Sequence, residues 1–403
     1  MHHIISKSWI VCGLATLLTT TSCIEETFPT DVATEGQLGA SNKSTEALLW
    51  AMPAFFNQLS VAGGCSYDWG YGSLMHIHDV MTEDMAVVSS GYDWYNSWAE
   101  NKYMGELYAA PQFIWNYYWK AIQTTNNMIS AIDPNQASEI QLGYLGVASA
   151  FRALYYLETS QSFEFLENDK VPSLNDAGND VKGLTTPIVR EGMTEKMTRN
   201  NPRVNRETMA EFILSNLNKA EQYIGHLKFT EKTLPHLDVV YGLKARCYMW
   251  LGQYALARDY ARKAIENSQS RPMNEEECLN PSSGFNDITR WMWGSKMQKE
   301  DDVVKTGILN WTSWMSNETT FGFANAGPKV MISKRTYNRI SDTDFRKRCG
   351  KRPKIRHWQA KPPSSLLRWA QDFLPMLQSN SDQCGKYTGP DGGSGKCLPH
   401  HEN

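Results

Sequence analysis

Two short stretches of the sequence combine flat aromatic rings with amide and carboxyl side chains. They are residues 92–101 and 310–317, and Trp69 with Tyr71 forms a smaller third group. A sugar ring has an apolar face of C–H bonds and a belt of hydroxyl groups, so a sugar site needs an aromatic platform flanked by polar side chains. Burial in the core, or a docking surface for another protein, is the alternative for each ring. The residues expected to contact a sugar are Trp94, Tyr95, Trp98, Asn101, Trp311, Trp314 and Tyr71.

Other reactive side chains do not form a recognised catalytic or metal-binding motif. His76 and His78 lie beside Asp79, but no third ligand stands at a metal-like spacing, which favours a structural or surface role. No motif places one carboxyl group opposite another, as a glycosidase would require. The stretch 389–396 differs from a phosphate-binding loop in its spacing and is followed by Cys397. The sequence therefore predicts no enzyme, no metal and no cofactor.

Composition and charge exclude further classes of protein. The chain has 403 residues, of which 41% are hydrophobic, and this content is enough for a substantial globular core. A net charge of −3, with no basic face before residue 345, argues against nucleic acid as a partner. Cys65, Cys247 and Cys278 form no Cys-x-x-Cys pair, so neither a zinc site nor a redox motif is indicated.

The first 22 residues have the pattern of a secretory signal. A short polar start is followed by an apolar run over residues 9–18 and by a small polar stretch that ends at Ser22. The apolar run is too short to cross a bilayer, and no later segment is long and uncharged enough to do so. Ser22 directly before Cys23, with Leu18 upstream, resembles the lipobox of bacterial lipoproteins. In that class Cys23 would carry acyl chains such as palmitate and become the mature N-terminus; a plain secreted protein is the alternative.

Helical periodicity dominates the middle of the chain and would position the aromatic stretches. Apolar residues recur at three- and four-residue steps over 114–132, again over about 144–161, and from Met209 to Ile224 after the capping residue Asn205. Two more helices, over about 237–250 and 254–266, form a hairpin. Between the helices, residues 60–110 and 268–330 show little regular period. Their aromatic content indicates functional surfaces rather than disorder.

The hairpin at 237–266 has the residue pattern of a tetratricopeptide repeat. Such a repeat places small residues where its helices cross and aromatic residues in the space between them. One repeat cannot bury its face alone, so other helices must stack on it, and the segment 112–160 supplies a pair of the right length. An ordinary helical hairpin is the alternative. The residues that fit the pattern are Ala245, Tyr248, Gly252, Tyr254, Ala257 and Ala264.

Six segments, in the same order along the chain, resemble blocks of one protein family. They are Cys23 with its signal, 79–85, 119–127, 150–156, 244–257 and 337–347. Together they are similar to the SusD/RagB family, the lipid-anchored nutrient-binding proteins of Bacteroidetes outer membranes. The resemblance implies a mainly α fold, with a tetratricopeptide-like helical-hairpin scaffold and long loops that bind a glycan or, in some members, peptides. It also implies a lid on a SusC-like, TonB-dependent transporter at the outer membrane, facing the cell exterior, and no enzymatic activity.

These patterns divide the chain into four parts. Residues 1–22 are the signal peptide, 23–40 a tether, 41–348 a SusD-like helical domain and 349–403 an anomalous tail. The tail begins in a run of basic residues without acidic ones, ends in a Pro-, Gly- and Ser-rich stretch, and matches nothing in the family. We interpret it as a disordered, frameshifted or truncated end; a genuine divergent tail is the alternative.

The leading functional interpretation is a cell-surface glycan-binding lipoprotein that captures oligosaccharide and passes it to the transporter. The alternative is a peptide-binding or protein-interaction scaffold of a transporter complex, and a glycosidase is the least favoured reading. Stacking platforms accept many rings, so the sequence does not indicate which glycan is bound.

Overall fold

The computed structural model describes residues 41–58, 68–82, 84–86, 98, 103–105, 107–168, 170–280, 287–301 and 331–348, and every structural statement below concerns these residues. The expected signal, tether and tail lie outside them, as do Cys23, Trp94, Tyr95, Asn101, Trp311 and Trp314. The fold is mainly α and tetratricopeptide-like. Its principal elements are α3 (Asn42–Ala54), η1 (Phe55–Asn57), α4 (Tyr71–Met81), β1 (Met85–Ala86), α5 (Ala109–Ser130), α6 (Glu139–Phe163), α7 (Glu195–Arg199), α8 (Arg206–Tyr223), η3 (Ile224–His226), α9 (Leu237–Trp250), α10 (Tyr254–Asn267), α11 (Glu275–Leu279), η4 (Ile288–Arg290), β2 (Met331–Ile332), α14 (Lys334–Arg339) and η7 (Phe345–Arg348).

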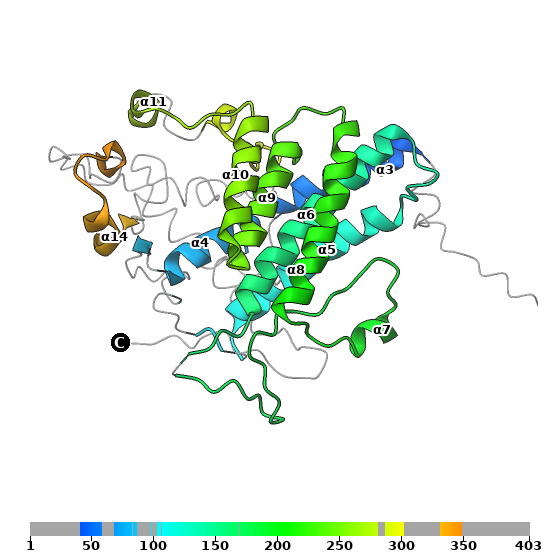
Figure 1. Cartoon of the computed structure of the whole chain (residues 1–403), viewed down its shortest axis with the longest axis horizontal. Helices are drawn as coiled ribbons and strands as arrows, with labels where there is room; N and C mark the ends of the chain where they lie inside the picture. The colour runs from blue at the N-terminus through cyan, green and yellow to red at the C-terminus, as the bar shows by residue number, and fades with distance from the viewer. Residues whose placement is uncertain are drawn as a thin grey trace, which may run out of the picture.

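Helix α6 is the centre of the fold, with α5, α8, α9 and α3 packed around it (Figure 1). Its first turn is held by a capping box, in which Ser138 N donates to Gln141 Oε1 at 3.0 Å and Gln141 N donates to Ser138 Oγ at 3.4 Å. Gly143 and Gly146 let the turn that follows α8 approach closely, since an added Cβ would lie 2.6 Å and 2.7 Å from backbone atoms of that turn. Every residue from 143 to 160 is buried, so tertiary packing stabilises this helix on all sides.

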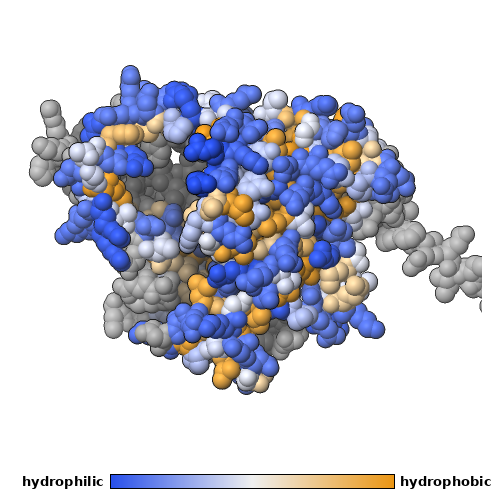
Figure 2. Space-filling model, in the orientation of Figure 1, coloured by the Kyte–Doolittle hydropathy of each residue, from blue (hydrophilic) through white to orange (hydrophobic). Residues whose placement is uncertain are grey.

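The α9–α10 hairpin lies at one edge of the helical stack (Figure 1). Gly252, in the turn between its helices, has a φ of +72°, a conformation that glycine adopts without steric penalty. Ala245, Ala257 and Ala264 are between 4% and 7% exposed, as expected for small residues where helices cross. Figure 2 shows hydrophobic side chains in patches between polar ones over the face of the stack.

Most of the predicted helices are confirmed. The predictions for the helix after Asn205 and for the hairpin match α8, α9 and α10 closely, and the Asn205 side chain caps α8 by accepting from Thr208 N at 2.8 Å. The helix predicted over 114–132 is α5, which begins five residues earlier because its first turn accommodates Pro111. Helix α6 begins five residues before the predicted Tyr144, because the capping box at Ser138 starts it earlier. The predicted pair in 112–160 is also confirmed, since α5 packs on α6.

Two expectations need correction. Within 60–110 the sequence showed little period, yet residues 71–81 form α4, whose apolar pattern is interrupted by a glycine and two histidines. The repeat pattern predicts that Tyr254 fills space between helices, but it is the first residue of α10 and is 71% exposed. No helix among the described residues is long and apolar enough to cross a membrane.

Candidate functional site

Tyr71, a predicted sugar contact, is the first residue of α4 and is tied to the helical core. Its hydroxyl group donates to both carboxylate oxygens of Glu158, at 2.7 Å and 2.9 Å. Its ring packs on Phe56 with 4.5 Å between the ring centroids. Burial, together with the Glu158 carboxylate, raises the pKa of Tyr71 well above its usual value, so the phenol stays protonated. The hydroxyl of Tyr71 therefore fixes α4 to α6.

Trp98 and Trp69 lie in the core. They are 3% and 6% exposed and belong to the main hydrophobic cluster. For these two rings, the structure therefore shows burial in the core, which the sequence left open as the alternative to sugar contact. Trp98 also fixes the chain between β1 and α5, at the end of the aromatic stretch 92–98.

A two-stranded antiparallel ladder joins distant parts of the sequence. β1 pairs with β2 in the register Met85 with Ile332 and Ala86 with Met331. Ser333 N donates to the Asp84 backbone oxygen at 3.1 Å and extends the contact by one residue. Tyr92 follows β1 by six residues, and Asn317 precedes β2 by 14 residues. The ladder therefore holds together the chain that leads to both predicted aromatic stretches.

The segment 287–301, which leads to the second aromatic stretch, is fastened to the core. The ring of Trp293 lies 5.1 Å from that of Phe151, centroid to centroid, and its Nε1 donates to the Thr233 backbone oxygen at 3.1 Å. Asn57 Nδ2 donates to the Lys296 oxygen at 3.0 Å and to Asp301 Oδ2 at 3.2 Å. The chain is thus anchored on η1 up to Asp301, nine residues before Asn310.

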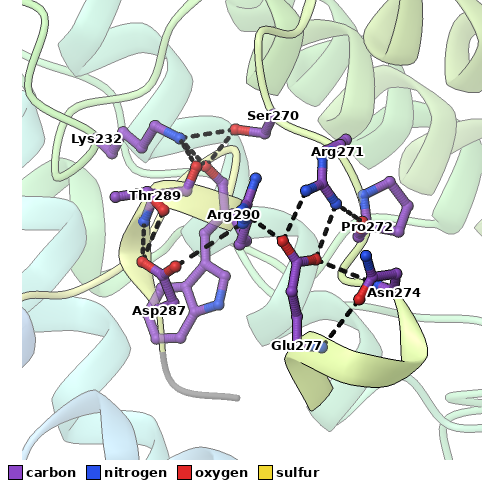
Figure 3. A network of polar contacts seen from close by, with 10 residues as sticks. Lys232, Ser270, Arg271, Pro272, Asn274, Glu277, Asp287, Thr289 and Arg290 are labelled. Carbon is purple, nitrogen blue, oxygen red and sulfur yellow. Dashed lines mark hydrogen bonds and ion pairs between the residues drawn. The ribbon is translucent and has the colours of Figure 1, made fainter. Parts of the chain in front are cut away.

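A polar network fixes the same segment to the turns around the hairpin (Figure 3). Lys232 Nζ donates to Ser270 Oγ at 2.8 Å and to the Thr289 oxygen at 2.7 Å. Arg271 and Arg290 each donate to Glu277 Oε1 at 2.6 Å. The hydrogen bond from Arg271, with that from the Asn274 backbone N–H, lowers the pKa of Glu277 to about 2. This ionised carboxylate therefore links the two arginines at neutral pH.

Helix α6 carries two buried charged side chains, and sequence reasoning did not single out either. Arg152, 3% exposed, donates through Nε to Asn216 Oδ1 at 2.8 Å and through Nη1 to Asn126 Oδ1 at 3.0 Å, and it forms an ion pair with Glu191. Glu158, 6% exposed, accepts from Tyr71, from Tyr118 at 3.3 Å and from Arg246 at 3.2 Å. One signal could have identified them, because they are the only charged residues between 144 and 161.

The described residues contain no group of three or more His, Cys, Asp or Glu side chains that could hold a metal. His76, considered for such a role, is buried, and burial lowers its pKa to about 4. His76 is therefore a neutral part of the core at physiological pH.

The fold is similar to solved structures of SusD-like proteins. A SusD-like carbohydrate-binding protein from Bacteroides vulgatus matches with a TM-score of 0.58 and 16% identity, over 76% of this chain and 60% of that chain. A putative sugar-binding protein from the same organism matches with a TM-score of 0.53 and 19% identity, over 73% and 61%. A SusD superfamily protein, also from Bacteroides vulgatus, matches with a TM-score of 0.53 and 15% identity, over 74% and 62%.

At these identities the likeness establishes the SusD-like helical fold. The chain spans about three fifths of the length of these structures. No family model matches the chain, and no curated protein matches it.

Proposed function

We propose that this chain belongs to the SusD family and is a glycan-binding lipoprotein of the cell surface, which captures oligosaccharide and passes it to a TonB-dependent transporter. The SusD-like fold supports the family, and two of the similar structures are described as carbohydrate- or sugar-binding proteins. The family's members are not enzymes, and the chain carries no catalytic motif. Capture by stacking and hydrogen bonding is therefore the chemistry assigned to it.

The β1–β2 ladder is the observation that carries this proposal. Residues 92–98 run between Ala86 and the buried Trp98, and the stretch 310–317 runs between Asp301 and Met331. The ladder brings the chain that leads from β1 toward 92–98 beside the chain that arrives at β2 from 310–317, which supports a shared sugar-binding surface.

In this surface, Trp94, Tyr95, Trp311 and Trp314 provide the stacking rings, and Asn101 provides hydrogen bonds to sugar hydroxyls. Trp98 and Tyr71 support the surface from within the protein, since their polar and apolar contacts are to the core. Such a site selects for apolar ring faces and tolerates several sugars.

A glycan-binding measurement tests the proposal. Purified protein is screened against a broad panel of oligosaccharides, and hits are quantified by isothermal titration calorimetry. Trp94→Ala and Trp311→Ala should each weaken binding about tenfold. The control is Trp250→Phe, on α9, whose indole donates to Glu164 at 3.0 Å and should leave glycan affinity unchanged. A folded protein that binds no glycan on the panel would overturn the assignment.

A lipid anchor at Cys23 is part of the proposal. In cells supplied with radiolabelled palmitate, the chain should become labelled and fractionate with the outer membrane. Protease added to intact cells should then digest it if it faces the exterior. Cys23→Ala should remove both the label and the membrane association, whereas an unlabelled wild-type chain would exclude the anchor.

One observation favours the alternative of a protein- or peptide-binding scaffold. On α10, Tyr254 and Ile265 are each 71% exposed, and exposed apolar groups of this kind are common in docking surfaces. If the scaffold reading is correct, Tyr254→Ser combined with Ile265→Ser abolishes ligand uptake while Trp94→Ala leaves it intact. The reverse pattern supports glycan capture.

A further inference from the structure

Glu158 connects three separate elements through one carboxylate. Tyr71 on α4 donates to both of its oxygens, Tyr118 on α5 donates to Oε2 at 3.3 Å, and Arg246 on α9 donates to Oε1 at 3.2 Å. We call these four residues the Glu158 network. Burial and the Glu158 charge raise the pKa of Tyr118, as they do that of Tyr71, so both phenols remain donors. Helices α4, α5 and α9 are thereby fastened to one point on α6.

The two charged members of the network differ in exposure. The Glu158 side chain is 6% exposed, whereas that of Arg246 is 48% exposed at the edge of the hairpin. A buried carboxylate is costly unless a cation and hydrogen-bond donors satisfy it. The Arg246 contact therefore affects how well Glu158 is satisfied and, with it, how firmly Tyr71 holds α4.

Helix α4 leads directly to the ladder. Thr82, just after α4, donates through Oγ1 to the His78 oxygen at 3.0 Å and to Asp84 Oδ2 at 3.2 Å. β1 begins at Met85, the residue that follows Asp84. Among the described residues, α4 therefore links the helical core to the β1–β2 ladder, and its first residue is the one that Glu158 holds.

We propose that Glu158 is a positioning residue, which holds the β1–β2 ladder in place through α4 and couples it to the α9–α10 hairpin through Arg246. The assignment to sugar binding rests on the function proposed above. In that setting, Glu158 fixes the anchors of both aromatic stretches without touching the sugar. Loss of the Arg246 contact reaches the ladder by way of the same carboxylate.

Hydrogen exchange tests this without any ligand. Glu158→Gln keeps the size of the side chain but removes its charge. Amides of α4, β1 and β2 should then exchange at least about tenfold faster, since hydrogen bonds to charged groups are among the stronger ones. The matched control is Glu164→Gln, because Glu164 is also a buried carboxylate at the end of α6 but accepts from Arg206 at 2.6 Å and from Trp250. It touches α8 and α9 and should leave α4 unchanged.

A double-mutant cycle separates coupling from loss of stability. Tyr71→Phe and Arg246→Met each remove one donor to Glu158, and Tyr71→Phe does so by deleting a single oxygen. If Glu158 couples them, their effects on exchange in the ladder are not additive, whereas independent structural roles would give additive effects. Unchanged exchange in Glu158→Gln, equal acceleration in Glu164→Gln, or additive effects in the cycle would each overturn the proposal.

Glycan affinity then distinguishes this proposal from the proposed function. Where wild-type protein binds a glycan, Glu158→Gln should weaken binding about tenfold and Glu164→Gln should not. If wild-type protein binds no glycan but the ladder still loosens in Glu158→Gln, the positioning role stands and the sugar-binding function fails. If Glu158→Gln does not fold, the exchange measured in Tyr71→Phe decides.

Discussion

Helices α6 and α10 occupy opposite situations in the same stack. Every α6 residue from 143 to 160 is buried, whereas Ala257 and Ala264 are the buried residues of α10. The first helix contacts neighbours on all sides, and the second contacts α9. Two apolar side chains of α10, those of Tyr254 and Ile265, are largely exposed. Among the described residues, the difference indicates that α6 is specified by packing on all sides, whereas α10 leaves part of its apolar surface exposed.

The largest expected contrast comes from the charged residues of the two helices. Arg152→Met on α6 would leave Asn126, Asn216 and Glu191 without their shared donor, and each of the two buried amide oxygens left unsatisfied typically costs about 1–3 kcal/mol. Arg258→Met on α10 removes an exposed pair with Asp259 and should change stability by less than about 0.5 kcal/mol. Urea unfolding followed by circular dichroism measures both. Equal losses would remove the distinction between centre and edge.

Acid should lower the free energy of unfolding through the buried His76 on α4. Burial lowers its folded pKa to about 4 from the unfolded value of 6.5, so the unfolded chain binds the proton more readily. The resulting stabilisation is complete above pH 6.5 and is lost as the pH falls toward 4, amounting to about 3 kcal/mol. His76→Phe should flatten the dependence of the unfolding free energy on pH over this window. An unchanged slope in His76→Phe would show that His76 does not titrate there.

Glycines give a matched test of packing at the centre of the stack. A Cβ at Gly146 on α6 would lie 2.7 Å from the backbone nitrogen of Ile224, so Gly146→Ala should destabilise the protein by about 1–3 kcal/mol. Gly242 on α9 has no atom within 4 Å of the corresponding position. Gly242→Ala should therefore be neutral or stabilising by up to about 1 kcal/mol, from helix propensity alone. Thermal unfolding of the two variants provides the comparison, and a destabilising Gly242→Ala would contradict it.

The contrast between buried and exposed helix faces also explains which helices the sequence could predict. The helices were predictable because apolar residues at three- and four-residue steps mark a packed face, and because Asn205 is a typical capping residue. Helix α4 was missed, since Gly72, His76 and His78 interrupt its apolar pattern even though His76 is buried. The exposure of Tyr254 is not predicted either, because a repeat motif does not reveal which of its positions the rest of the chain covers.

The candidate site was predictable only in part. Aromatic composition indicated the stretches 92–101 and 310–317, but their common anchor is a ladder of two residues per strand, too short to leave a periodic signal. The Glu158 network joins residues 40 to 88 positions apart, and local patterns carry no information about such contacts. Arg152 and Glu158, the charged residues of the otherwise uncharged stretch 144–161, were the available sign, since buried charges require partners.

The smallest expected effect is also the sharpest test of the outer face of α10. Ile265 is 71% exposed and Ala264, its neighbour in sequence, is 4% exposed. Ile265→Ser should change the free energy of unfolding by less than about 0.5 kcal/mol, as surface substitutions generally do. Ala264→Leu should cost about 1–3 kcal/mol, because added methylene groups would press against α9. A loss above about 1 kcal/mol for Ile265→Ser would mean that something covers this face in solution, and the measurement repeated at several protein concentrations would then show whether a second copy of the chain does so.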